Sequence, residues 1–293
     1  MPYKQNDPWH RAIRRFLANA SIGPESRYQY TVWLNQAGTL LGHPVPSSLT
    51  LADLRELESL LTCGETSKAV MLTTVRAYLI FAGCKAARTW KFPYRARQAV
   101  NGVFLSEVDV AAIRQYARAL GTETELIFSL GADNGLRSID MRRLTLTNAH
   151  ELLRCKHSTI LGKGRGGGKP GHLELSRMTE RPLSEYLKKR QDWTGTAVRE
   201  SDRLIVLPTT GGLRPVSEDY ISNRITKLSE ASGIHFRTHD LRRTYGHRLH
   251  LAGVPIETIA RLMRHESINQ SFRAYIGILG DELRAAQDRL NCP

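Results

Sequence analysis

Residues 237–277 carry arginine, histidine and tyrosine side chains at spacings that could bring them together. His239 and Arg242 are three positions apart, so both project from one side of the first turn of a predicted helix. His265 follows a second predicted helix, and Tyr275 lies in a third. An arginine fork binds two phosphate oxygens, an imidazole exchanges a proton near neutral pH, and a tyrosine hydroxyl attacks once it is activated. These residue types suit chemistry on a phosphate ester.

Each of these residues also has a structural explanation when it is considered alone. A tyrosine on an apolar helical stripe usually belongs to the core, and a histidine just past a helix end complements the helix dipole. His247 and His250 could be imagined as metal ligands, but no third ligand at metal spacing accompanies them. We interpret that pair as part of a solvated face.

A glycine-rich stretch at 162–176, GKGRGGGKPGHLELS, resembles a phosphate-binding loop only superficially. That loop needs Gly-Lys followed by Ser or Thr and opens a helix, whereas Lys169 is followed by Pro170 and an alternating strand. The stretch instead predicts a β-hairpin with a basic tip. The basic side chains of this tip are Lys163, Arg165 and Lys169.

The surrounding pattern predicts a mainly α protein with a small β-sheet, arranged in two domains. Four helical stretches before residue 84 predict a helical domain over 1–84. Residues 85–102 are basic, contain no acidic residue and have little apolar periodicity, which predicts a linker. The second domain, 103–293, combines helices with predicted strands within 143–161 and the glycine-rich hairpin.

The net charge and the hydropathy of the chain limit which partners it can bind and in which compartment it is expected. The 42 lysines and arginines exceed the 28 acidic residues by 14, which indicates a polyanion such as DNA, RNA or an anionic membrane surface. The longest apolar runs, such as YLIFAG at 78–83, fall far short of the ~20 residues of a membrane-spanning helix. The N-terminus has charges where a secretory signal has its apolar core. The four cysteines form no CxxC pair, which favours reduced thiols in a cytoplasmic protein and argues against structural zinc.

Taken as an ordered set, the motifs resemble those of the tyrosine recombinase (phage integrase) family. The matching residues are Arg137 in GLRSID, Lys163 in GKG, His239 and Arg242 in HDLRR, His265 in MRH, and Tyr275. Each short motif is weak alone, but the complete set in order on a basic chain is a strong signal. The resemblance covers nearly the whole chain. It implies a helical core DNA-binding domain, a linker and an α+β catalytic domain that form a C-shaped clamp on duplex DNA.

The resemblance implies that cationic side chains stabilise the transition state. Arg137 and Arg242 would stabilise the negative charge that develops on the non-bridging phosphate oxygens, and His265 would hydrogen-bond the phosphate. Because these side chains supply the positive charge, the resemblance implies no metal and no nucleotide or other cofactor.

The same resemblance assigns the proton transfers and the nucleophile. Tyr275 would attack the phosphorus and form a 3′-phosphotyrosine, and its hydroxyl needs activation because its ordinary pKa is ~10. His239 is the candidate base. Lys163 would protonate the departing 5′ oxygen.

Two features depart from the family pattern. The family commonly has LGH before its second histidine, and Arg264 replaces that glycine here. Ten positions separate His265 from Tyr275, one more than expected, and one extra helical residue would rotate a side chain by roughly 100°. We retain Tyr275 as the nucleophile because it is the only tyrosine in that window of the sequence.

Further basic residues are expected to hold the DNA backbone. They lie in the linker, at the hairpin tip and beside the second arginine: Lys85, Arg88, Lys91, Arg95, Arg97, Arg165, Lys169 and Arg243. By resemblance, the protein would act as a homotetramer on two double-stranded recombination sites, through a Holliday junction. Because the chain begins directly with the helical domain, we expect a simple integrase, resolvase or chromosome-dimer-resolving type without an arm-site domain.

Two other functions fit parts of the pattern. A type IB topoisomerase shares the catalytic residues but would relax supercoils as a monomer without site specificity. A non-catalytic DNA-binding protein could use the same fold, although such a protein would be free to lose Tyr275 or Lys163.

Overall fold

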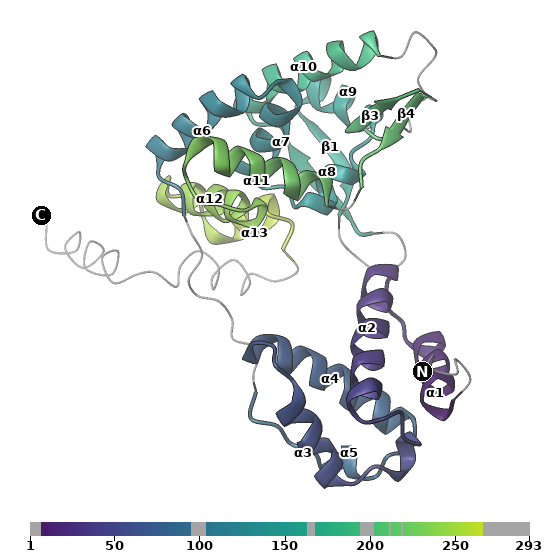
Figure 1. Ribbon diagram of the computed structural model, residues 1–293. Helices are drawn as coiled ribbons and strands as arrows, with labels where there is room; N and C mark the ends of the chain where they lie inside the picture. The colour runs from purple at the N-terminus through teal and green to yellow at the C-terminus, as the bar shows by residue number, and fades with distance from the viewer. Residues whose placement is uncertain are drawn as a thin grey trace, which may run out of the picture. The chain divides into compact units, whose positions relative to one another are not determined.

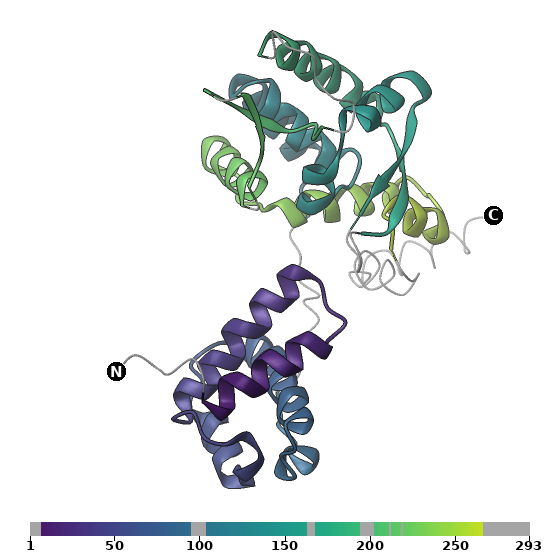
Figure 2. The same ribbon diagram turned by 90° about the vertical axis from the view of Figure 1, so that its right-hand side faces the viewer.

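The computed structural model describes residues 7–94, 104–162, 168–193, 202–210, 212–217 and 219–265. The chain divides into two compact units, Met1–Ala99 and Val100–Pro293 (Figure 1 and Figure 2). Both units are mainly helical, and each has its own apolar core. None of the helices in the described ranges has the length and apolarity needed to cross a bilayer.

The first unit is a small helical bundle. Its elements are α1 (Pro8–Asn19), α2 (Pro24–Leu40), the 3₁₀ turn η1 (Pro46–Ser48), α3 (Leu51–Leu60), α4 (Glu65–Phe81) and α5 (Ala86–Thr89). The four predicted helical stretches correspond to α1 to α4. Trp9 of α1 is fully buried, and its Nε1 donates to the Leu34 carbonyl of α2 at 2.9 Å. A Cβ at Gly38 would clash with this indole, so glycine allows α1 to pack closely on α2.

Residues 85–94, which the sequence pattern placed in the linker, lie within the first compact unit. Residues 86–89 form α5, and both Ala87 and Trp90 are fully buried. The Trp90 Nε1 donates to Glu58 Oε1 at 2.6 Å. Because the segment is basic, its sequence did not indicate that Ala87 and Trp90 pack into the core of the first unit. Arg95 and Arg97, which the linker prediction also included, lie outside the described residues.

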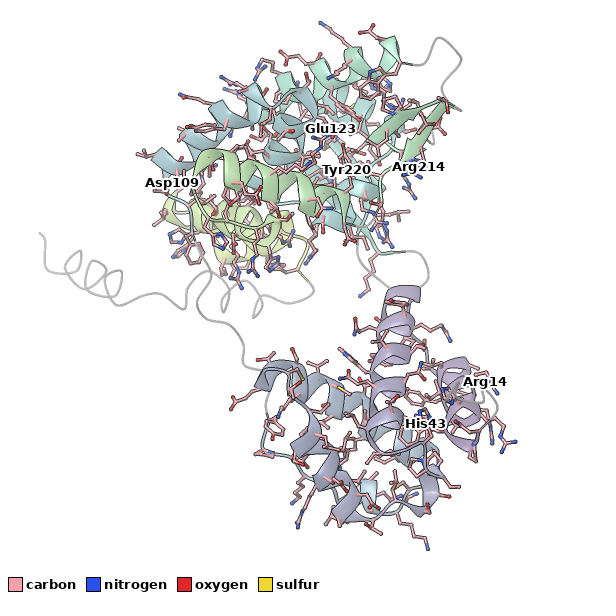
Figure 3. The ribbon with its side chains drawn as sticks, in the orientation of Figure 1. Arg14, His43, Asp109, Glu123, Arg214 and Tyr220 are labelled. Carbon is pink, nitrogen blue, oxygen red and sulfur yellow. The ribbon has the colours of Figure 1, made fainter. Side chains whose placement is uncertain are left out.

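The second unit is built around helix α7. Its elements are α6 (Glu107–Ala119), α7 (Thr122–Ala132), α8 (Ser138–Arg143), α9 (Leu146–Cys155), β1 (His157–Leu161), β2 (Pro170–Glu174), α10 (Arg177–Asp192), β3 (Val206–Thr209), β4 (Gly212–Pro215), α11 (Tyr220–Ser232), α12 (Thr238–Leu251) and α13 (Ile256–Leu262). Helix α7 is buried from Thr124 onward, and α6, α10, α11 and α12 pack against it (Figure 1). At its start, Glu123 accepts a 2.6 Å hydrogen bond from the Tyr220 hydroxyl of α11 (Figure 3).

Two antiparallel hairpins supply the small β component. Strand β1 pairs with β2, from His157 opposite Glu174 to Leu161 opposite Pro170, which confirms the predicted glycine-rich hairpin. Strands β3 and β4 form a second hairpin, from Val206 opposite Pro215, that was not predicted. The fold is thus mainly helical with small sheets, as the sequence pattern indicated.

The strands predicted within residues 143–161 are confirmed only at β1. Residues 146–155 form helix α9 instead. Its start is capped, because the Asn148 amide donates to Thr145 Oγ1 at 3.2 Å and Asn148 Oδ1 accepts from the Thr145 amide at 3.1 Å. Leu146, Ala149 and Leu152 are buried at helical spacing. The alternating Leu and Thr residues at the start of this segment obscured that period.

Candidate active site

The turn between α7 and α8 carries Arg137. Leu136 before it is fully buried, and Arg137 occupies the N-cap position of α8. Its backbone amide donates to Asp140 Oδ2 at 3.2 Å, while its side chain remains 29% exposed and places Nη1 3.8 Å from the same oxygen. Gly135 has a φ of 62°, and a Cβ there would clash with the Tyr245 ring. The turn therefore requires glycine at position 135, and the turn determines where the partly exposed side chain of Arg137 reaches the surface.

Arg242 of α12 reaches the same turn from inside the unit. It is 1% exposed and is among the largest fully buried side chains. Its Nη1 donates to the Gly135 carbonyl and its Nη2 to the Met263 carbonyl just after α13. Since a buried guanidinium must be hydrogen-bonded, these two carbonyls hold Arg242 from both sides.

His265 closes the end of α13 beside the two arginines. Its backbone amide donates to the Ala260 carbonyl at 3.0 Å. Burial, followed by the positive charges of Arg242 and Arg137, lowers the pKa of His265 to about 3. The imidazole is therefore neutral at pH 7. An anionic phosphate would reverse part of this effect by favouring the protonated ring.

His239 lies in the first turn of α12. Its side chain has an exposed edge, but the surrounding protein still removes part of its hydration. This partial burial lowers the pKa of His239, and the positive charges of Arg243, Arg242 and Arg137 lower it further. A neutral imidazole is the form that can accept a proton. Both histidines thus lie within electrostatic range of both arginines, so the structure brings Arg137, His239, Arg242 and His265 together.

The end of the β1–β2 hairpin lies against α8, the helix that Arg137 caps. The Gly162 amide donates to the Lys169 carbonyl at 2.8 Å, and Arg143 Nη1 donates to the Gly162 carbonyl at 2.5 Å. A Cβ at Gly162 would lie 3.5 Å from Asp140 Oδ1. Lys163 and Arg165, which the sequence pattern predicted at the hairpin tip, lie outside the described residues, as does Tyr275.

Two side chains at this site were not predicted as site residues. Asp140 is fully buried, and its Oδ2 lies 3.8 Å from both Arg137 Nη1 and Arg264 Nη2. The signal for Asp140 was its position three residues after Arg137 at a helix start. Arg264 was noted only as a departure from the family motif, and nothing in the local sequence indicates that its charge turns inward.

The described residues predicted to hold DNA differ in exposure. Lys85, Arg88 and Lys91 are exposed on the first unit, and Lys169 is exposed at the end of the hairpin. Arg243 is half-buried, with Nη1 3.9 Å from Asp240 Oδ1. Among these five residues, Arg243 lies near the site, because its charge acts on the ring of His239.

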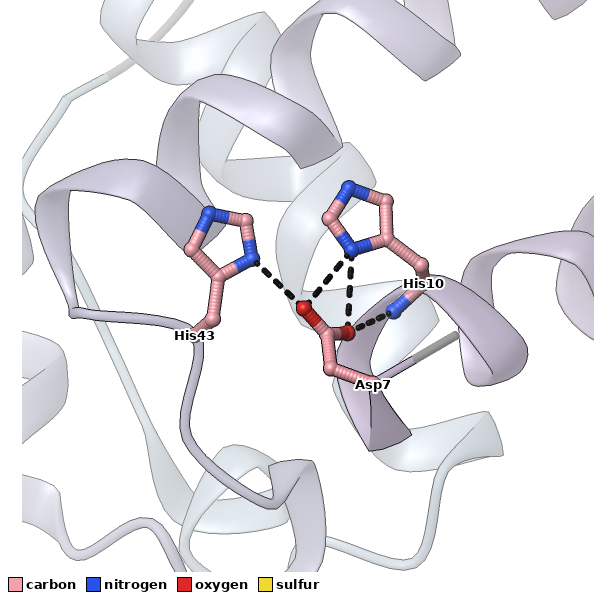
Figure 4. Close-up of side chains that lie close together, drawn as sticks. All are labelled: Asp7, His10 and His43. Atoms are coloured by element: carbon pink, nitrogen blue, oxygen red, sulfur yellow. Dashed lines mark hydrogen bonds and ion pairs between the residues drawn. The ribbon is translucent and has the colours of Figure 1, made fainter. Parts of the chain in front are cut away.

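One group of potential metal ligands occurs among the described residues, and it lies in the first unit. Ligand atoms of Asp7, His10 and His43 lie within 4.8 Å of one another (Figure 4). Asp7 Oδ1 accepts from the His10 backbone amide at 2.8 Å, so Asp7 caps α1. His10 Nδ1 lies 2.9 Å from that oxygen, and His43 Nδ1 lies 3.4 Å from Asp7 Oδ2. We interpret this group as a helix cap that connects the turn after α2 to the start of α1.

Known proteins share this fold. Across 97% of this chain and 99% of its own, the crystal structure of XerA recombinase is similar at 18% identity and a TM-score of 0.53. The Tn1549 transposon integrase in complex with circular intermediate DNA covers 96% and 99% at 14% identity and 0.73. A lambda integrase dimer bound to a COC′ core site covers 90% and 76% at 16% identity and 0.65.

Sequence comparison identifies the family directly. A search of curated proteins gave no significant match. The model of the Phage integrase family matches residues 104–279, which is more than half of the chain and includes every predicted catalytic residue. The chain therefore belongs to the phage integrase family, the tyrosine site-specific recombinases.

Proposed function

We propose that this protein cleaves and rejoins DNA strands at specific sites through a 3′-phosphotyrosine intermediate, with Tyr275 as the nucleophile. The observation that carries the proposal is the grouping of Arg137, Arg242, His239 and His265 around the α7–α8 turn. Two arginines and two neutral imidazoles at one place suit a phosphodiester, whose charge increases during displacement.

In the proposed reaction, the bond that forms is matched by one that breaks, and each proton has a donor and an acceptor. The Tyr275 oxygen attacks the phosphorus, and its proton passes to the neutral ring of His239. The bond from phosphorus to the 5′ oxygen breaks, and Lys163 supplies a proton to that oxygen. Arg137 and Arg242 stabilise the additional negative charge. The phosphotyrosine retains the energy of the phosphodiester, so a free 5′ hydroxyl on another strand can reverse the step without ATP.

Strand exchange requires two DNA sites and several active subunits. We propose a homotetramer that joins two double-stranded sites and resolves them through a Holliday junction, in the cytoplasm. The similar structures support a DNA substrate, because the lambda integrase dimer is bound to a core site and the Tn1549 integrase to a circular intermediate DNA. A type IB topoisomerase reaction remains the second candidate function, since it would use the same residues on one duplex.

Covalent capture tests the proposed function. The protein is incubated with fragmented genomic DNA, denatured, and the DNA that remains attached is sequenced. We expect one site to be enriched, and a nicked duplex of that site should then trap the protein covalently. A protein that binds DNA but forms no adduct would be a non-catalytic binder. Adducts without exchange between two labelled sites would favour the topoisomerase.

The role of Lys163 can be tested by changing the leaving group. Lys163→Ala should cleave poorly, but should regain cleavage on DNA with a 5′-bridging phosphorothiolate, because sulfur leaves without protonation. Single-turnover cleavage of the two substrates measures this. Lys169→Ala, at the exposed end of the same hairpin, is the matched control. If Lys169→Ala regains cleavage and Lys163→Ala does not, Lys169 is the acid.

The predicted contacts of Arg95 and Arg97 with the DNA backbone should appear in the salt dependence of binding. Each neutralised phosphate contributes roughly −0.9 to the slope of log affinity against log salt. Replacing both arginines with glutamine should therefore flatten the slope by up to ~2 and weaken binding to all sequences equally. Titrations at several salt concentrations measure the slope.

The control for this prediction replaces the exposed Lys188 and Lys189 of α10 with glutamine, which changes the net charge equally. Equal slopes for both double variants would contradict a specific backbone contact. Loss of affinity for one sequence alone would mean that Arg95 or Arg97 reads base edges or groove shape.

A further inference from the structure

Arg264 combines a strained backbone with an inward-facing charge. Its φ is 52°, in the left-handed region that glycine adopts freely and most other residues avoid. Its side chain is nevertheless only 8% exposed. A glycine would remove both the strain and the burial of a cation. A strained residue of this kind persists where the surrounding contacts determine its conformation, and such residues concentrate at functional sites.

The side chain of Arg264 connects three parts of the active site. Its Nη1 donates to the Leu262 carbonyl of α13 at 3.1 Å and lies 3.5 Å from the His172 carbonyl of β2. Its Nη2 lies 3.4 Å from the Gly135 carbonyl in the α7–α8 turn. Its stem packs on β2, because a Cβ at Gly171 would lie 2.9 Å from Arg264 Cδ.

Arg264 shares one hydrogen-bond acceptor or counterion with each proposed catalytic arginine. Asp140 Oδ2 lies 3.8 Å from Arg137 Nη1 and 3.8 Å from Arg264 Nη2. The Gly135 carbonyl accepts from Arg242 Nη1 and also lies 3.4 Å from Arg264 Nη2. The buried carboxylate thus faces Arg137 and Arg264, and the carbonyl faces Arg242 and Arg264.

This sharing has an electrostatic consequence for Arg137. Asp140 is fully buried, so its charge acts strongly on nearby cations. Without Arg264, the carboxylate would attract Arg137 alone, drawing its guanidinium inward and cancelling its charge. With Arg264 present, the three charges sum to one net positive charge, and the partly exposed Arg137 remains available to a phosphate.

We propose that Arg264 is a positioning residue. It interacts with Asp140 alongside Arg137 and with the Gly135 carbonyl alongside Arg242, and thereby keeps Arg137 and Arg242 directed at the scissile phosphate. The inference rests on the proposed function. It adds a third arginine that acts on the reaction without touching the substrate.

The test uses Arg264→Gly, because glycine fits a φ of 52° and the variant should fold. Cleavage of a nicked duplex of the captured site should fall by about 10- to 100-fold, because a small misplacement of catalytic groups is costly in rate, while DNA affinity stays unchanged. Arg261→Ala is the matched control: it removes an exposed charge from α13 and should cleave like the wild type.

A methylphosphonate at the scissile position separates positioning from general damage. Replacing one non-bridging oxygen with a methyl group removes the charge that Arg137 and Arg242 stabilise. If Arg264 acts through them, the deficit of Arg264→Gly should largely disappear on this substrate. An equal deficit on both substrates, or wild-type cleavage of the ordinary phosphate by Arg264→Gly, would overturn the inference. A wild-type protein that cleaves neither substrate would overturn the proposed function as well.

Discussion

Replacing Tyr275 with phenylalanine is expected to abolish the covalent adduct with DNA while leaving DNA affinity unchanged. Only the hydroxyl is lost, so the contacts that hold DNA remain, but no oxygen is available to attack the phosphorus. The measurement is a denaturing gel of a labelled nicked duplex after incubation with each variant, beside a binding titration of the same duplex.

Tyr245→Phe is the control for this prediction. Burial raises the pKa of Tyr245, which makes its hydroxyl a poor nucleophile, and its ring packs against Gly135. Phenylalanine keeps that packing, so Tyr245→Phe should form the adduct. Persistence of the adduct in Tyr275→Phe at the wild-type yield would show that another side chain attacks.

Removing either proposed catalytic arginine should reduce cleavage by ~10²–10³-fold, which is the loss typical of a donor that stabilises transition-state charge. Single-turnover cleavage rates of Arg137→Ala and Arg242→Ala measure this. DNA affinity should change far less, because other cations hold the backbone.

The two arginine variants should differ in stability. Arg137 is partly exposed, so its loss should leave the melting temperature nearly unchanged. Arg242 is fully buried, and its removal leaves the Gly135 and Met263 carbonyls without this donor. The Arg242→Ala variant should therefore also have a lower melting temperature. Arg154→Ala, an exposed position on α9, is the control. Cleavage within a few-fold of wild type would identify the affected arginine as structural.

Local patterns were sufficient to predict much of the fold. One of the four helical stretches predicted before residue 84 is α3, and its start carries a local signal in Thr50 and Asp53: the Thr50 amide donates to Asp53 Oδ2 at 2.7 Å. The glycine-rich hairpin was expected because glycine punctuation separated two short strands. Such signals succeed because the cap or turn lies within a few residues of the sequence that encodes it.

The missed features depend on contacts between distant segments. Trp90 looked like part of a basic connector, and only its burial and its hydrogen bond to Glu58 show that it belongs to the core of the first unit. Arg264 looked like an ordinary departure from a motif, because its partners Asp140 and His172 lie far away in sequence. For the active site, spacing predicted the pairing of His239 with Arg242, but not the carboxylate that balances the arginines.

The two carbonyls bound by Arg242 have a consequence for how the active site is maintained. Helix α13 is short, and a helix of that length rarely persists without tertiary support. One guanidinium fastens its end to the α7–α8 turn, which continues the buried helix α7. Local fraying of α13 would have to break a buried charged contact, so this segment and the central helix should lose their structure as one cooperative unit. His265, which follows α13, should therefore be held as rigidly as the core, and the site should keep its arrangement when no DNA is bound.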